Sequence, residues 1–430
     1  MTIKLPDDPK EYVYEDLISA MLIASGHYVE SRLRYRSGSA DLLELDAVAT
    51  PIDDYLARII IEVKSGGWGF NDLFKLIGQT HYTGMHRAWL VHRKAADAQK
   101  QEGLEELCSN SAVDTRQFQM DDLNDVQGMG FPMARTISDG NLHLLVEALW
   151  WSRIADRIAQ KRCVDWWKSE GKNPPEVVSA SRDYSFAVEQ SMFKPKPASR
   201  ANALYDAYKD APNLVNAILE HMSGGDATKT LALRKQTWNT HERLPLQYLM
   251  TLGNRSRLAI IKNALDHLLE NPDEATEAQP AWGKVTWTLI FLPSNFSKGL
   301  EALKSAPNAH MVAYFFQVFT EALGGFYFPD DPDDVELVSN LTGVAAGEIA
   351  TMLDLLDTFF PINNGWVQTG KHGMVMLKAV PAYMRGAGCC VRSRAFAIDK
   401  YEDRFKGNGW HMGKWHNALY EILRKDWETA

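Results

Sequence analysis

The chain has 430 residues and a formal net charge of −9 at pH 7. This length exceeds that of one ordinary domain and predicts two or three. The acidic total argues against a protein that only coats nucleic acid. No apolar run approaches the ~20 residues that span a bilayer, and the first residues contain no apolar signal segment. We therefore expect a cytoplasmic protein without a membrane anchor.

Hydrophobic periodicity predicts alternating helices and strands in the first 92 residues. Apolar residues recur at helical spacing in the first of these segments, and branched apolar runs bounded by turn formers mark the strands. In chain order we predict a helix over 11–26, strands over 42–49 and 57–66, a helix over 71–83 and a strand over 87–92. This order predicts an α/β domain over residues 1–130, with a mixed sheet flanked by helices.

The two predicted strands carry charged residues in a regular arrangement. Because alternate residues of a strand face the same side, Glu62 and Lys64 project together. Asp46 lies on the preceding strand and joins them if the two strands pair. Asp41 is a rival acid, but the same alternation places it on the opposite face of its strand.

Such a cluster suits phosphodiester hydrolysis. Two carboxylates can hold Mg²⁺, which prefers oxygen ligands, activates water and neutralises developing negative charge. Mn²⁺ is expected to substitute for it. We expect Asp46 and Glu62 to bind the metal, with the backbone carbonyl of Val63 as a further ligand. The ammonium of Lys64 would orient the water or a phosphate oxygen.

An acid-x-Lys triplet has little value by itself, because about three are expected by chance in a chain of this length. Three are present, ending at Lys10, Lys64 and Lys172. The triplet at Lys64 differs from the others because it ends a branched apolar strand and follows an Asp-bearing strand. The alternative is a surface ion pair on an edge strand, but charges on the inward face of an Ile-rich strand would be costly unless used.

The stretch 12–92 resembles the core of the PD-(D/E)xK nuclease superfamily, in its restriction-endonuclease-like and Mrr-like branches. The resemblance assigns Asp46, Glu62 and Lys64 to the active centre and Glu15 to the acid of the first helix. Gln79 matches a glutamine that several branches carry on the following helix, with helix capping as its alternative role. The chain departs from the family pattern in having no Pro before Asp46.

The resemblance implies a Mg²⁺-dependent endonuclease that hydrolyses DNA. At the level of architecture alone, it also implies a role in prokaryotic restriction or antiviral defence. Two alternatives stay open. One is a non-catalytic factor that binds nucleic acid or protein through a degenerate nuclease fold, and the other is an RNase.

The remainder of the chain is mainly helical in pattern. We expect a helical domain over 140–325, with connections at 172–186 and 193–200, and a winged-helix-like and helical region over 328–430. In the latter, two helices flank Gly343 and precede two short strands. The second of these helices is acidic, so a protein contact is as plausible as DNA reading.

Two further features of this region allow more than one interpretation. Its basic C-terminal segment contains Trp410, Trp415 and Trp427, which fits either nucleic acid or an ordinary helix. The adjacent Cys389 and Cys390 are expected to be buried thiols. We expect the helical region to mediate homo-oligomers or bind a partner protein.

Overall fold

A computed structural model describes residues 6–37, 40–94, 98–111, 114–120, 131–209, 211–228, 244–271, 294–306, 308–360, 367–397, 399–408 and 411–427. The chain divides into two compact units, Met1–Trp150 and Trp151–Ala430, which are described separately. Among the described residues, every helix is too short or too polar to cross a membrane. The three sequence-based domain ranges stay predictions.

The N-terminal unit contains a mixed sheet, as predicted, but this sheet has five strands instead of the three predicted. Its strands are β1 (His27–Ser37), β2 (Ala40–Pro51), β3 (Ile59–Lys64), β4 (Arg87–His92) and β5 (Asp114–Gln119), in the order β1-β2-β3-β4-β5. The first three strands are antiparallel, whereas β3, β4 and β5 are parallel. The central strands are almost completely buried, which agrees with their branched apolar sequences.

Three helices accompany this sheet. α1 (Glu11–Ala24) precedes β1, α2 (Phe70–Thr83) connects β3 to β4, and α3 (Ala98–Asn110) connects β4 to β5. Gly26 follows α1 at φ +100°, and a Cβ there would meet the chain at Ala134 and Arg135. The glycine is therefore required both by the backbone conformation and by the close approach of a later segment.

The strand β1, the helix α3 and the strand β5 were not predicted. The sequence of β1, HYVESRLRYRS, is rich in charges, but from Val29 to Arg36 its charged residues alternate with less polar ones, a strand signal that the sequence analysis missed. The strand pairs with β2 from His27↔Pro51 to Ser37↔Ala40. Cross-strand ion pairs such as Arg34 with Glu44 form on its charged face.

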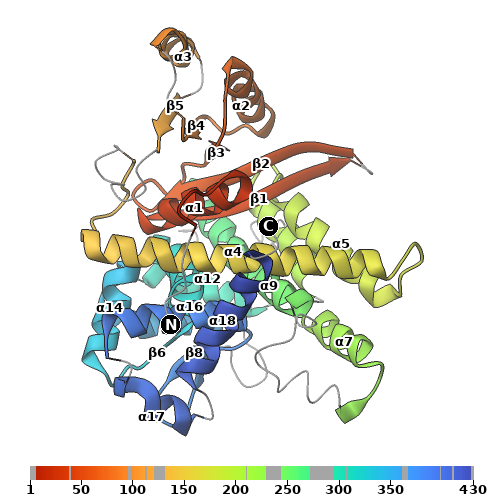
Figure 1. The fold of residues 1–430 in the computed structure, drawn as a ribbon, viewed down its shortest axis with the longest axis vertical. Helices are drawn as coiled ribbons and strands as arrows, with labels where there is room; N and C mark the ends of the chain where they lie inside the picture. Colours follow the sequence, from red (N-terminus) through yellow and green to blue (C-terminus); the bar gives the residue numbers. More distant parts are fainter. Residues whose placement is uncertain are drawn as a thin grey trace. The chain divides into compact units, whose positions relative to one another are not determined.

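The hairpin of β1 and β2 is longer than the rest of the sheet. β2 pairs with β3 only between Ala47 and Ala49, so the half of the hairpin nearer Ser37 projects beyond β3 (Figure 1). The ladder between β2 and β3 ends at Ala47↔Ile61. Asp46 and Glu62 are the next residues on the two strands, at the point where the hairpin leaves the sheet.

The C-terminal unit is mainly helical. Its helices are α4 (Asp139–Ser169, which begins in the N-terminal unit), α5 (Glu176–Ser191), α6 (Pro197–Tyr208), α7 (Ala211–Ser223), α9 (Leu244–Glu270), α12 (Ser294–Ser305), α13 (Val312–Glu321), α14 (Pro332–Thr342), α15 (Ile349–Phe359), α16 (Ala382–Ala395), α17 (Asp399–Gly407) and α18 (Met412–Trp427). The connection expected over 172–186 is wrong from Glu176 onward. Pro175 stands at the N-cap of α5 and starts this helix instead of interrupting it.

The last third of the chain contains a small three-stranded sheet. Its strands are β6 (Phe326–Tyr327), β7 (Val367–Thr369) and β8 (Val375–Leu377), in the order β6-β8-β7. The two helices predicted around Gly343 are α14 and α15, and Gly343 ends α14 at φ 75°. The two short strands predicted after them are β7 and β8.

An aromatic core joins this sheet to the C-terminal helices. It includes Phe326 and Phe328 from the β6 segment, Tyr401 and Phe405 from α17, and Trp415 from α18. Trp415 is fully buried in this core. It is therefore part of the folded interior and offers no stacking surface to nucleic acid; Trp410 and the side chain of Trp427 lie outside the described residues.

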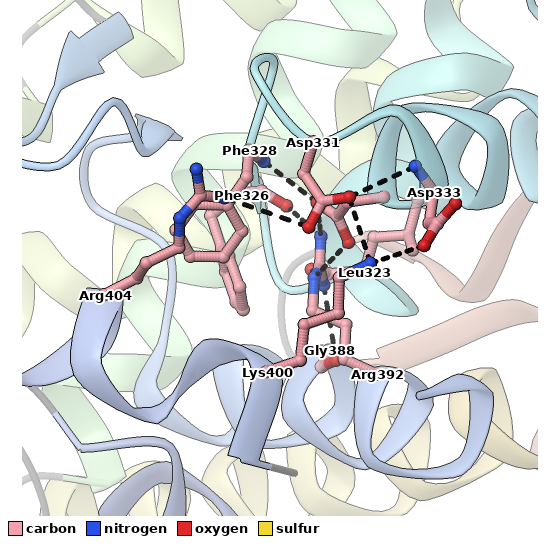
Figure 2. Close-up of polar contacts among 10 residues, drawn as sticks. Leu323, Phe326, Phe328, Asp331, Asp333, Gly388, Arg392, Lys400 and Arg404 are labelled. Atoms are coloured by element: carbon pink, nitrogen blue, oxygen red, sulfur yellow. Dashed lines mark hydrogen bonds and ion pairs between the residues drawn. The ribbon is translucent and has the colours of Figure 1, made fainter. Parts of the chain in front are cut away.

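A buried ion pair fixes the segment between β6 and α14 to α16. Arg392 and Asp334 are both 0% exposed, with Arg392 Nε 2.9 Å from Asp334 Oδ1. The guanidinium also donates to the backbone oxygens of Leu323, Phe326 and Gly388 (Figure 2). Every N–H direction of this arginine is thus used, which is the condition under which a buried charge is tolerated.

Candidate active site on the N-terminal sheet

The strand register brings Asp46 and Glu62 to the same end of the β2–β3 ladder. In an antiparallel pair, residues that follow the last paired positions lie opposite one another and face the same side. The backbone N–H of Val63 donates to Asp46 Oδ2 at 2.8 Å. This hydrogen bond holds the carboxylate of β2 directly against the Glu-Val-Lys segment of β3.

Glu62 is the most deeply buried acid of this group, with only 1% of its side chain exposed. Its Oε1 accepts from two ammonium groups, Lys64 Nζ and Lys75 Nζ, each at 2.8 Å. Its Oε2 is buried and has no hydrogen-bond partner among the described residues. A buried oxygen without a partner is costly for stability, and such atoms mark sites where a ligand or ion would complete the interactions.

Lys64 is braced from two sides. Besides Glu62, it contacts Asp72 Oδ1 at 3.2 Å, an acid in the first turn of α2. Desolvation alone would lower the pKa of Lys64, but the hydrogen bonds and charges of Glu62 and Asp72 raise it to about 12. Lys64 is therefore a permanently charged group in a fixed position.

Asp46 is held in its protonated form more strongly than an ordinary aspartate. Burial, followed by the charges of Glu62 and Glu15, raises the pKa of Asp46 to about 7. The Val63 N–H and the charge of Lys75 act in the opposite direction. The charge of Glu15 on α1 thus acts on Asp46. We call the three predicted acids, Asp46, Glu62 and Glu15, the carboxylate cluster.

Gln79 is buried on α2 and links this helix to β2. Its Nε2 donates to the backbone oxygen of Glu44 at 3.0 Å, which is not a helix-capping contact. Its Oε1 is buried and has no hydrogen-bond partner among the described residues. On the same helix Tyr82 is exposed, with its ring 6.0 Å from that of Tyr35. Like Glu62 Oε2 on β3, Gln79 Oε1 is therefore an oxygen that is buried without a partner in the described part of the chain. It belongs to α2, the helix that also carries Lys75.

Lys75 and Asp72 were missed by the sequence analysis. Both lie on α2, and their side chains reach the charged end of β3. A sequence signal for Lys75 existed, because it precedes Gln79 by four residues and so lies one turn away on the same helical face. Asp72 carries no comparable signal, since an acid in the first turn of a helix is common for electrostatic reasons alone.

The oxygen donors of this region fit a magnesium ion that keeps part of its water shell. Within the described ranges, no three His, Cys, Asp or Glu side chains converge closely enough to hold a metal by themselves. Two carboxylates, Asp46 and Glu62, are nevertheless present, and Glu62 Oε2 lacks a partner. Mg²⁺ is commonly bound by one or two carboxylates, with waters completing its octahedron. The backbone carbonyl of Val63 lies between Glu62 and Lys64 in sequence.

Comparison with protein-family models, with curated proteins and with solved structures finds no match for this chain. The resemblance to PD-(D/E)xK nucleases therefore depends on the residues named above.

Proposed function

We propose that the N-terminal unit is a Mg²⁺-dependent hydrolase of DNA phosphodiester bonds. The observation that carries this proposal is the buried Glu62, which has one oxygen held by two lysines and the other without a hydrogen-bond partner, beside a second carboxylate, Asp46. Carboxylates that serve only the fold are normally fully hydrogen-bonded. An incompletely satisfied and strongly charged group of this kind is typical of a functional site.

The residues have distinct roles in this proposal. Asp46 and Glu62 would supply carboxylate oxygens to the metal, and Gln79 on α2 has a buried Oε1 without a hydrogen-bond partner among the described residues. When bound, Mg²⁺ lowers the pKa of a coordinated water and neutralises charge that develops on the phosphate. Lys64, fixed by Glu62 and Asp72, orients the attacking water or a phosphate oxygen as a point charge.

The direct test is cleavage of supercoiled plasmid by the purified protein, with and without Mg²⁺ or Mn²⁺. Asp46→Ala, Glu62→Ala and Lys64→Ala should each reduce the rate by at least ~100-fold, since each removes a group that acts on the transition state. Asp41→Ala is the matched control: Asp41 lies on the same strand, is exposed and pairs with Arg36. It should retain the wild-type rate.

Other outcomes would redirect the proposal. Cleavage that survives the Asp46, Glu62 and Lys64 changes would remove the assignment of the site. Cleavage of RNA but not DNA in parallel reactions would make the protein an RNase. Binding without any metal-dependent cleavage would favour the non-catalytic alternative. A role in prokaryotic defence stays a prediction from the resemblance.

The C-terminal element supports a different use. The order α13, β6, α14, α15, β7, β8 and the sheet β6-β8-β7 support a winged-helix-like interpretation of this element. However, the exposed residues of α15 include Thr351 and Asp354 and no Lys or Arg. α12 also packs on this helix, so closely that a Cβ at Gly299 would lie 2.6 Å from the Phe359 ring. We therefore assign the winged-helix-like element a structural or protein-binding role.

A further inference from the structure

The two lysines on Glu62 differ in how firmly they are held. Lys64 ends a buried strand, is 26% exposed and also contacts Asp72. Lys75 lies on α2, is 49% exposed, and its ion pair is with Glu62. Because a lysine ammonium sits on a flexible four-carbon stem, the more exposed of the two can move at small cost.

Both ammonium groups contact the same atom, Glu62 Oε1. Together they place two positive charges beside a buried carboxylate, which is the charge a divalent cation would bring. The metal-free site is therefore compensated by protein charges. A cation bound at Asp46 and Glu62 would make one of these ammonium groups superfluous, and like charges a few ångströms apart repel strongly in a partly buried site.

Resting on the function proposed above, we propose that Lys75 is an exchangeable counter-ion of Glu62: it pairs with Glu62 while no divalent cation is bound, and it leaves to contact a phosphate of the nucleic acid once the cation is in place. Lys64 stays on Glu62 in both states because Asp72 braces it. Because Lys75 is 49% exposed, its released ammonium can turn to solvent, where a phosphate of the bound strand is the anion that would attract it.

The exchange of Lys75 would affect the binding of both the cation and the nucleic acid. Without substrate, Lys75 competes with the cation for Glu62, so its removal should tighten cation binding. With substrate, Lys75 adds one phosphate contact, but only when the cation is present. A residue that serves only the stability of α2 would show neither effect, and a phosphate-binding lysine that does not exchange would act equally with and without a cation.

The first experiment measures binding of Mn²⁺ alone to the full-length protein by electron paramagnetic resonance. Lys75→Met should bind Mn²⁺ about three- to tenfold more tightly than wild type, the range expected from removing a competing, partly exposed ion pair. Lys94→Met, which removes an exposed lysine of the same unit, is the matched control and should leave the affinity unchanged. Unchanged or weaker Mn²⁺ binding by Lys75→Met would overturn the proposal.

The second experiment measures the affinity for a fluorescein-labelled DNA duplex as a function of salt, in Ca²⁺ and in chelator. In Ca²⁺, Lys75→Met should lower the slope of log Kd against log salt by about 0.9, the value for one lost phosphate contact. In chelator, wild type and variant should have the same slope. An equal change of this slope in Ca²⁺ and in chelator would contradict the proposed exchange, because Lys75 would then contact phosphate whether or not a cation is bound.

A Glu62→Ala variant separates the two proposals. If Mn²⁺ binding does not depend on Glu62, the metal site and the exchange both fail. If Mn²⁺ binding requires Glu62 but Lys75→Met behaves like Lys94→Met, the proposed function stands and only the exchange is wrong.

Discussion

Two of the buried carboxylates in the described part of the chain, Asp334 and Glu62, are paired with cations in opposite ways. Asp334 in the C-terminal unit is paired with Arg392, which is as buried as its partner and fully hydrogen-bonded. Glu62 in the N-terminal unit is paired with two partly exposed lysines and keeps an oxygen without a partner. The first arrangement is closed and holds chain segments together, whereas the second is open to exchange.

The largest effect on stability should come from removing one partner of the buried ion pair between Arg392 and Asp334. Arg392→Met leaves Asp334 as an uncompensated charge at 0% exposure and should lower the free energy of unfolding by about 3–5 kcal/mol. Urea denaturation followed by circular dichroism measures this loss. Glu62→Gln provides the contrast: Lys75 can turn to water and Lys64 keeps Asp72 as a partner, so the change should stay within about 1 kcal/mol. Equal losses would erase the distinction between the two carboxylates.

Lowering the pH should destabilise the N-terminal unit through protonation of His27. Burial lowers the pKa of His27 to about 4 from its ordinary value of 6.5, despite its hydrogen bond to the Leu22 carbonyl. The neutral ring thus contributes stability that is fully present above pH 6.5 and is lost as pH falls toward 4, about 3 kcal/mol in total. Hydrogen exchange of β1 amides should accelerate over this range, and His27→Gln should abolish the dependence.

Asp46 should show the opposite pH dependence. Its pKa is raised to about 7, so the folded chain holds a proton that the unfolded chain releases near pH 4. Stability from this group is therefore present at low pH and is lost as pH rises through 7. In chelator at pH 8, Asp46→Asn should raise the free energy of unfolding of the N-terminal unit by roughly 1–3 kcal/mol. A destabilised variant would indicate that Asp46 serves the fold.

The smallest effect is expected at the rim of the C-terminal network. Lys400 contacts Asp331 at 3.1 Å and Asp333 at 2.6 Å (Figure 2), but it is partly exposed. Lys400→Ala should cost less than about 1 kcal/mol, and added salt should reduce the difference from wild type further. A loss as large as that of Arg392→Met would mean that the rim and the buried pair act as one unit.

The sequence by itself determined the elements whose patterns are local. The branched runs of β3 and β4, the amphipathic α2 and the helix-turn-helix around Gly343 were all predicted, because their side-chain periodicity matches the backbone that they form. The alternation that places Glu62 and Lys64 on one face of β3 is equally local. The position of Asp46 on a predicted strand was also evident from the sequence, but its proximity to Glu62 depended on the pairing of β2 with β3.

Tertiary structure alone decided the rest. The register of β1 was decided by its pairing with β2, although the alternation of charged and less polar residues in its sequence already favours a strand. Trp415 is core because β6 and α17 enclose it. Lys75, eleven residues after Lys64, meets the same carboxylate oxygen only through the packing of α2 against the end of β3. Contacts between distant residues depend on how elements pack, and no local pattern encodes that packing.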